Sequence, residues 1–256
     1  MHDFPLPNNS HDLTGQVALV TGATSGLGWH FSRVLAGAKV AIAGRRKERL
    51  TELAALINLD GGDCASFVLD MTDAVATVSV VAEIEQSLGM LTILVNNAGI
   101  PDAQLAKKMD LELIDRVLDT NVRGPFVLSR EVAKRLISEK KPGRIINITS
   151  MAAYQYDGNG AALYSVSKAA IARMTKALSV EWAKFNINLN AIAPRVFSSE
   201  MVDGMQVRMG DLAGYFLRKR IGYPPQLDSN LLFFSSPASE CVTGTIVKAD
   251  DGQTNK

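Results

Sequence analysis

Cysteine and histidine are scarce in this sequence, and neither forms a recognisable ligand motif. Only Cys64 and Cys241 are present, far apart, and His2, His11 and His30 have no spacing that would pair them around a metal. We therefore expect neither a metal site nor a disulfide framework. Cysteines without a pairing pattern are typical of a reducing compartment, so a cytoplasmic location is expected.

Excess charge and long apolar runs are also missing. The formal net charge is only +1 over 256 residues, without the concentrated basic patch that nucleic acids or anionic membranes attract. No apolar run approaches the roughly 18 residues that span a bilayer. We expect a small-molecule substrate as partner, and no nucleic-acid or membrane partner.

Apolar content is high, and its arrangement predicts the fold. Hydrophobic residues make up 47% of the chain, enough for a large core. Residues 1–14 lack periodicity and are interpreted as a flexible tail. Over residues 15–256, short apolar runs such as QVALVTG and KVAIAGR alternate with segments of helical spacing at 27–36, 46–58, 73–88, 110–139 and 161–185. This alternation predicts one α/β domain, a doubly wound parallel sheet of the Rossmann type flanked by helices.

The ends of the expected strands carry residues that suit a dinucleotide. TGATSGLG follows the first strand, and its glycines allow a tight turn and close approach of backbone N–H groups to a phosphate. At the second strand end, Gly44 stands where an acidic residue would bind the ribose of NAD, and Arg45 and Arg46 follow. Guanidinium groups suit a 2′-phosphate, although the two arginines could also be a solvated pair. Asp70, at the third strand end, either accepts from an adenine amino group or caps the next helix.

Tyr164 and Lys168 stand four residues apart in AALYSVSKAA. On a helix they would share one face. A neighbouring ammonium favours phenolate, and so lowers the phenol pKa from about 10 toward the range where proton transfer is most effective. The plainer interpretation is a tyrosine packed on a lysine stem, so the surrounding motifs have to decide.

Those motifs occur in a specific order. TGxxxGxG spans Thr21 to Gly28 and NNAG spans Asn96 to Gly99; Asn121 in LDTNVRG, Ser150 in IINITS and the YxxxK pair follow. Any one of them is weak evidence, but the ordered set resembles the short-chain dehydrogenases/reductases over nearly the full length of the chain.

The resemblance implies the chemistry of the site. Tyr164 would be the general acid for carbonyl reduction, and Lys168 would lower its pKa and hold the nicotinamide ribose. Ser150 would polarise the substrate oxygen, and Asn121 would support a proton relay to Lys168. The residues expected to bind the cofactor are Gly22, Thr24, Ser25, Gly26, Leu27, Gly28, Arg45, Arg46, Asp70, Met71, Asn97, Ala98, Gly99, Tyr164, Lys168, Pro194, Val196 and Ser199. NADP(H) is expected as the cofactor in preference to NAD(H).

Residues 195–223 form an insertion that we expect to act as a substrate lid. Met201, Met205 and Met209 are spaced by four within it, which suits either an adaptable apolar surface or a stripe packed on the core. The residues expected to contact the substrate are Ser150, Tyr154, Tyr156, Met201 and Met205.

Two positions depart from the family pattern. Arg195 follows Pro194 where the family usually has glycine, and could strain the turn, shift the substrate loop, be neutral, or reach a substrate carboxylate or phosphate. Asp251 replaces a glycine near the C-terminus, which puts the subunit contact there in doubt.

These observations predict an NADPH-dependent reductase that converts a ketone into a secondary alcohol reversibly. A 3-oxoacyl-thioester reductase with the same mechanism is the nearest alternative, and its carrier protein would need basic residues such as Arg195, Arg208, Arg218, Lys219 and Arg220. A non-catalytic nucleotide-binding scaffold is the alternative from another class. The resemblance also implies a homotetramer built through the helices at 110–139 and 161–185.

Overall fold

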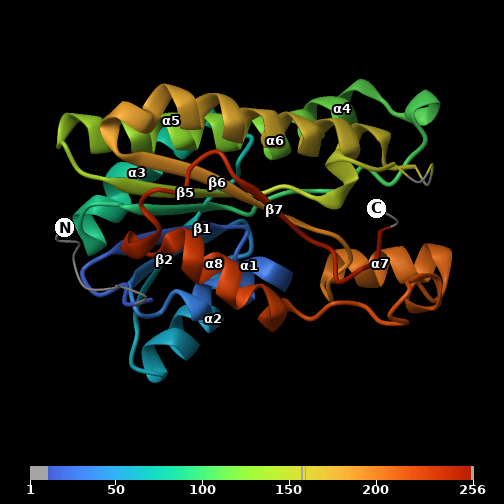
Figure 1. The fold of residues 1–256 in the computed structure, drawn as a ribbon, viewed down its shortest axis with the longest axis horizontal. Coiled ribbons are helices and arrows are strands. Elements are labelled where there is room, and N and C mark those ends of the chain that lie inside the picture. Colours follow the sequence, from blue (N-terminus) through green and yellow to red (C-terminus); the bar gives the residue numbers. More distant parts are fainter. Residues whose placement is uncertain (1–10, 157, 159, 255–256) are drawn as a thin grey trace, which may run out of the picture.

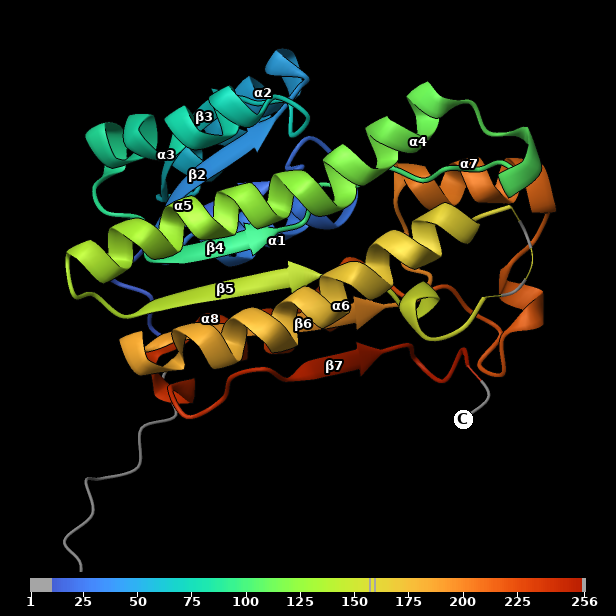
Figure 2. The same ribbon diagram turned by 90° about the horizontal axis from the view of Figure 1, so that it is seen from above.

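The computed structural model describes residues 11–156, 158 and 160–254. Within them, seven parallel strands form one sheet in the order β3-β2-β1-β4-β5-β6-β7. Figure 2 shows the strands side by side. The strands are β1 (Val17–Thr21), β2 (Lys39–Gly44), β3 (Asp63–Val68), β4 (Ile93–Asn96), β5 (Gly143–Ile148), β6 (Ile187–Pro194) and β7 (Ile246–Ala249). The order reverses between β1 and β4, which is where such sheets bind ligands.

Helices cover both faces of the sheet, as Figure 1 shows, so the predicted doubly wound α/β fold is confirmed. One face carries α1 (Gly26–Val34), α2 (Lys47–Leu59) and α8 (Asp228–Ser235), and the other carries α3 (Ala74–Leu88), α5 (Gly124–Ser138) and α6 (Ala162–Trp182). The shorter 3₁₀ turns are Ala106–Lys108, Met151–Ala153, Ala183–Phe185, Ala213–Tyr215, Pro224–Leu227 and Pro237–Ser239. The central strands are fully buried because both of their faces pack against helices.

The helix expected over residues 110–139 is in fact three segments. These are α4 (Leu111–Leu118), a π-helical turn (Asp119–Arg123) and α5. Pro125 explains the interruption: proline has no N–H to give the carbonyl four residues earlier, and its ring crowds that carbonyl. The N–H of Gly124 instead donates to Asp119, five residues earlier. The turn that results contains Asn121.

The segment at 195–223 leaves the sheet at the end of β6, and its two ends are paired with each other. It contains α7 (Glu200–Met209), and its base is closed by the N–H of Ser198 donating to the Gly222 carbonyl at 2.9 Å. Inside it, Val202, Leu212 and Phe216 form a small core of their own, and Met205 packs against them. This segment is therefore a small structured unit attached to the end of β6, and its role as a substrate lid stays a prediction.

Part of the stretch expected as an N-terminal tail is packed against the domain. Residues 1–10 lie outside the described residues, but Leu13 is only 2% exposed and belongs to the same hydrophobic cluster as Phe31 and Leu35 of the α1 region. Apolar burial therefore fixes the chain before β1 begins.

Candidate active site

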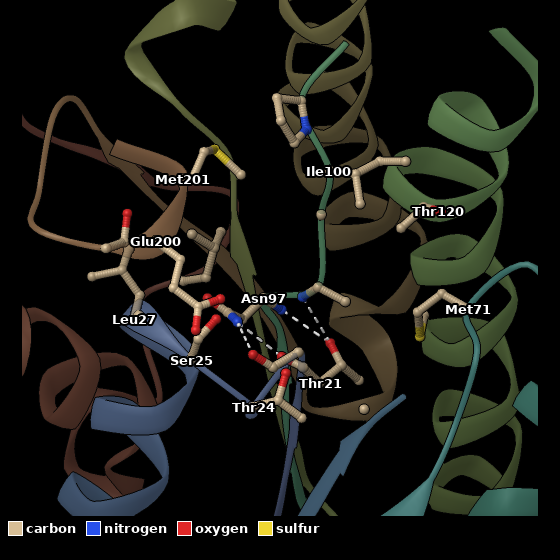
Figure 3. A pocket seen from close by; sticks show the side chains of 18 of the residues that line it. Thr21, Thr24, Ser25, Leu27, Met71, Asn97, Ile100, Thr120, Glu200 and Met201 are labelled. Atoms are coloured by element: carbon tan, nitrogen blue, oxygen red, sulfur yellow. Dashed lines mark hydrogen bonds between the residues drawn. The ribbon is translucent and has the colours of Figure 1, made fainter. Parts of the chain in front are cut away.

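A cleft of about 540 Å³ opens at the carboxyl ends of β1 and β4 (Figure 3). Most of the residues expected from the sequence line it together. From those expectations the cleft contains Gly22, Thr24, Ser25, Gly26, Leu27, Arg45, Arg46, Asp70, Met71, Asn97, Ala98, Gly99, Ser150, Tyr164, Lys168, Pro194, Ser199 and Met201. Segments far apart in the chain thus converge where the strand order reverses.

The glycine-rich loop is tied to the end of β4 by Asn97. Its side-chain amide donates to the carbonyl of Thr21 at 2.9 Å and to that of Gly22 at 3.2 Å, as the dashed lines of Figure 3 show. Gly22 has φ +67°, and a Cβ there would lie 2.7 Å from the Cα of Ala98. Only glycine accommodates both this φ and this contact.

Gly28 lies beneath the loop and serves packing. A Cβ at this position would lie 2.3 Å from the carbonyl oxygen of Gly22 and 2.4 Å from the amide nitrogen of Asn97. Gly28 is not one of the residues lining the cleft. Gly28 therefore lets the loop pack closely against it. The expected contact with the cofactor would be made by the residues at the start of α1 that do line the cleft.

The two arginines after β2 lie at the mouth of the cleft, near different partners. Arg46 donates from Nε and Nη2 to the hydroxyl of Thr24 at 3.1 and 2.9 Å. Arg45 lies 4.0 Å from the carboxylate of Asp70. Asp70 also accepts from the N–H and hydroxyl of Thr72, whereas the cap of α3 is Asp73. Of the two roles left open for Asp70, the helix cap is therefore wrong.

Ser150, Tyr164 and Lys168 meet at the end of β5. The ammonium of Lys168 donates to the carbonyl of Ile148 at 2.9 Å and lies 5.6 Å from the centre of the Tyr164 ring. Ser150 lies close enough to the Tyr164 side chain to lower its pKa. Ser150 and Lys168 are 8% and 4% exposed. A phenol, an alcohol hydroxyl and an ammonium thus share one corner of the cleft, in which Ser150 and Lys168 are buried and Tyr164 is half-buried.

Burial dominates the acidity of this corner. It raises the pKa of Tyr164 to about 12, an effect that the hydrogen bond with Ser150 opposes and the nearby charge of Asp102 reinforces. Burial likewise lowers the pKa of Lys168 to about 8. Desolvation outweighs the opposing effects on the pKa of Tyr164 here, and the expected lowering of that pKa by Lys168 stays a prediction.

Asn121 holds the NNAG loop in place. Its carboxamide accepts from the N–H of Ile100 at 2.8 Å and donates to the same residue's carbonyl at 2.9 Å, with a further bond to Ser167 at 3.1 Å. A Cβ on Gly99 would lie 3.3 Å from the Lys168 ammonium and 3.4 Å from the Asn121 oxygen, so both groups flank this glycine. The relay role of Asn121 stays a prediction.

Asp102 was missed by the sequence analysis. It is 4% exposed, and one carboxylate oxygen accepts from the N–H groups of Leu163 and Tyr164 at 2.9 and 3.1 Å. The other oxygen accepts from Ala103 at 2.7 Å. Since Ala161, at the N-cap of α6, offers no side-chain bond, Asp102 caps the helix that carries Tyr164 and Lys168 from a distant loop. The sequence offered one signal for this role, because Asp102 is an acidic residue shortly after the NNAG motif.

Several expected residues lie elsewhere. Tyr154 and Tyr156 are 44% and 46% exposed and do not line the cleft, and Lys248 stacks over the Tyr154 ring at 4.5 Å. Val196 is also outside the lining: it packs against the small core of the 195–223 segment, and its N–H and carbonyl pair with the carboxamide of Gln253. Substrate contact by the two tyrosines and by Met205 stays a prediction.

The structure shows the surroundings of Arg195 and Asp251, the two departures from the family pattern. Arg195 lines the cleft and is not among the described residues with positive φ, so the strained turn we considered there is wrong. Asp251 does have positive φ, at +49°, and binds Arg218 at 2.6 Å and Arg220 at 2.7 Å. It therefore fastens the segment at 195–223 to the C-terminal segment.

The cleft fits a nicotinamide dinucleotide. The start of α1 and the closely approached Gly22 backbone suit a pyrophosphate, and Arg45 and Arg46 at the mouth supply cations. Among the described residues, no three His, Cys, Asp or Glu side chains cluster as a metal site would require. No helix in the described part of the chain is long and apolar enough to cross a membrane.

Fold and site together define a dinucleotide-binding oxidoreductase. Comparison with known families agrees: residues 16–208 match the short chain dehydrogenase family model, and the chain belongs to that family.

Three relatives align with nearly the whole chain. It is 33% identical to 2-dehydro-3-deoxy-D-gluconate 5-dehydrogenase of Dickeya dadantii, over 95% of this chain and 97% of the relative. It is 36% identical to a 3-oxoacyl-(acyl-carrier-protein) reductase of Rickettsia bellii, over 94% and 98%. A structure of a candidate 2-deoxy-D-gluconate 3-dehydrogenase from Agrobacterium tumefaciens with bound NADP matches with TM-score 0.87 and 31% identity, over 96% and 99%.

Proposed function

We propose that this enzyme uses NADPH to reduce a ketone to a secondary alcohol, reversibly. The observation that carries the proposal is the buried corner where Ser150, Tyr164 and Lys168 meet inside a cleft suited to a dinucleotide. When bound, the reduced nicotinamide would supply the hydride. The chain's own residues would bind, orient and protonate the substrate.

Tyr164 would give its proton to the substrate oxygen, and Ser150 would hold that oxygen with a hydrogen bond. The phenol of Tyr164 is protonated at neutral pH, the form that gives a proton, although its raised pKa makes it a weaker acid than one matched to the working pH. Lys168, fixed on the Ile148 carbonyl, keeps a cation beside the phenol where negative charge develops. Val202 and Met201 of α7 add apolar surface at the substrate end of the cleft.

NADPH is favoured over NADH because Arg45 and Arg46 stand at the cleft mouth and Gly44 leaves no carboxylate for a ribose hydroxyl. The NADP-bound structural relative supports this choice.

A panel of neutral ketones, keto acids and 3-oxoacyl thioesters, assayed with NADPH and NADH by nicotinamide absorbance, tests the proposal. Tyr164→Phe should lose turnover by at least about a hundredfold while still binding NADPH. Substantial turnover by this variant would remove Tyr164 from its role as the acid.

A carboxylated substrate is the second candidate. Arg195 lines the cleft, and the Dickeya dadantii relative is named for a sugar acid. A guanidinium there would bind a carboxylate. Arg195→Gly should then lower kcat/KM for keto acids selectively, with neutral ketones unaffected; equal effects on both classes would exclude the arginine from substrate recognition.

The thioester alternative receives less support from the structure. Arg218 and Arg220, two of the basic residues that a carrier protein would need, are both bound to Asp251. Because the Rickettsia bellii relative is named as a 3-oxoacyl-(acyl-carrier-protein) reductase, thioesters are retained in the substrate panel.

A homotetramer is proposed as the assembly. A groove of about 420 Å³ between α5 and α6 is lined by Phe126, Leu178 and Trp182 among others, and Phe126 is 46% exposed. A second copy would cover these apolar groups. Light scattering of wild type and Phe126→Glu would test this, since an unchanged mass in the variant contradicts a contact at this face.

A further inference from the structure

Glu200, the first residue of α7, lies across the mouth of the cleft from the arginines after β2. Its two carboxylate oxygens are 3.2 and 3.1 Å from the Nη1 and Nη2 atoms of Arg46. Arg46 and Glu200 are 154 positions apart in the chain, so only the fold brings them together. Figure 3 shows the Glu200 side chain reaching toward Ser25, at the start of α1.

Glu200 interacts with Arg46 and Ser25, two groups that could equally bind an anionic ligand. Its pKa is lowered first by the hydrogen bond with Arg46, against a desolvation that raises it, and further by a hydrogen bond with Ser25. Ser25 makes no side-chain cap bond to its own helix. The starts of α1 and α7 also press together, since a Cβ on Gly26 would lie 3.0 Å from the Cβ of Ser199.

Both pairs of adjacent N–H donors on the Arg46 guanidinium are engaged in this arrangement. Its Nε and Nη2 atoms serve Thr24, and its Nη1 and Nη2 atoms serve Glu200. A phosphate monoester is best bound by the same paired donors that Glu200 now uses. A 2′-phosphate on the cofactor would therefore have to replace the carboxylate.

We propose that Glu200 is a residue that sets cofactor selectivity, by competing with the 2′-phosphate of NADPH for the guanidinium of Arg46. The inference rests on the proposed use of NADPH. A cofactor without the 2′-phosphate has nothing to exchange with Glu200 and leaves the ion pair intact. Glu200 therefore weakens NADPH selectively, while the two arginines still favour it.

Calorimetric titration of the full-length enzyme with NADPH and with NADH tests this. Glu200→Gln keeps the size and polarity of the side chain but removes its charge. It should tighten NADPH binding roughly three- to tenfold, a range set by an exposed, charge-assisted pair, and leave NADH binding unchanged. Asp203→Asn, an exposed carboxylate in the same first turn of α7, is the matched control and should change neither.

A double-mutant cycle identifies the partner. In an Arg46→Gln background, Glu200→Gln should have no further effect on NADPH binding, because the contested guanidinium is gone. A persisting gain in that background would overturn the proposal.

Two other results would also overturn it. One is unchanged NADPH affinity in Glu200→Gln. The other is an equal gain for NADPH and NADH, which would place the carboxylate against the phosphates that both cofactors share. Failure of the wild-type enzyme to bind NADPH would instead remove the proposed function itself, and this inference with it. Thermal melting of each variant shows that the fold is kept.

Discussion

The ammonium of Lys168 lies 5.6 Å from the centre of the Tyr164 ring and donates to the Ile148 carbonyl at 2.9 Å. It is 4% exposed, and burial lowers its pKa to about 8. A charged lysine in this position costs folding free energy. Lys168 should therefore affect the stability of the fold as well as catalysis.

The first prediction follows from that pKa. Between about pH 8 and about pH 10.4, the unfolded chain keeps the Lys168 proton while the folded chain releases it. More protons on the unfolded state mean that stability rises with pH. The free energy of unfolding of wild type, minus that of Lys168→Met, should therefore rise by about 2–3 kcal/mol from pH 8 to pH 10.

Urea denaturation at several pH values measures this difference. Lys176→Met, an exposed lysine of the same helix, is the control and should give a difference that does not vary with pH. A flat profile for Lys168→Met as well would mean that the ammonium is hydrated in the folded state.

The second prediction concerns Asp102, which holds the first turn of α6. Asp102→Ala leaves the N–H groups of Leu163 and Tyr164 without their acceptor, at a cost of about 1–3 kcal/mol in stability. It should also lower kcat, because the position of Tyr164 is no longer fixed. Asp102→Asn retains an acceptor and removes a charge that raises the pKa of Tyr164, so the basic limb of the pH profile should move to lower pH.

Asp73→Ala is the control for this effect. It removes the cap of α3, where Asp73 accepts from Val75 and Ala76, so stability should fall by about 0.5–2 kcal/mol without loss of kcat. If Asp102→Ala behaved in the same way, Asp102 would be a structural cap only.

The sequence predicted the sheet and the meeting of its strand ends because these depend on local signals. Near-continuous apolar runs identify buried strands, and parallel strands bring their carboxyl ends to one edge. The spacing of Tyr164 and Lys168 is likewise local, since a single helix turn joins them. Helix continuity at 110–139 was overestimated, although Gly124 and Pro125 were visible in the sequence.

Contacts between distant segments could not be predicted. Asp102 reaches Leu163 across 61 positions, and Gln253 reaches Val196 across 57. Such pairs carry no periodicity, and they form only because the sheet brings their loops together. Burial is hard to predict for a related reason: the Lys168 charge is readable from spacing, whereas the burial that raises the pKa of Tyr164 is not.

The third prediction tests the close packing beneath the glycine-rich loop. An alanine Cβ at position 28 would meet the Gly22 carbonyl at 2.3 Å and the Asn97 amide nitrogen at 2.4 Å, and backbone cannot move aside cheaply. Gly28→Ala should therefore weaken cofactor binding by about tenfold or more and cost roughly 1–3 kcal/mol in stability. Gly37→Ala, whose nearest neighbour is Leu13 at 3.9 Å, should be neutral by both measures.

Cofactor titration and thermal melting of the two variants decide the matter. Tight binding by Gly28→Ala would show that the loop can shift without losing its shape.

The last prediction concerns Arg45, which lines the cleft 4.0 Å from Asp70. Replacing it with aspartate puts a carboxylate beside the expected 2′-phosphate and offers an acceptor to a ribose hydroxyl. The ratio of kcat/KM for NADPH to that for NADH should fall by about tenfold or more. Arg33→Asp makes the same change of charge on α1 outside the cleft lining and should leave the ratio unchanged. If Arg45→Asp left the NADPH-to-NADH ratio unaltered, the wild-type preference would not depend on Arg45. Arg46 would then be the residue that binds the 2′-phosphate.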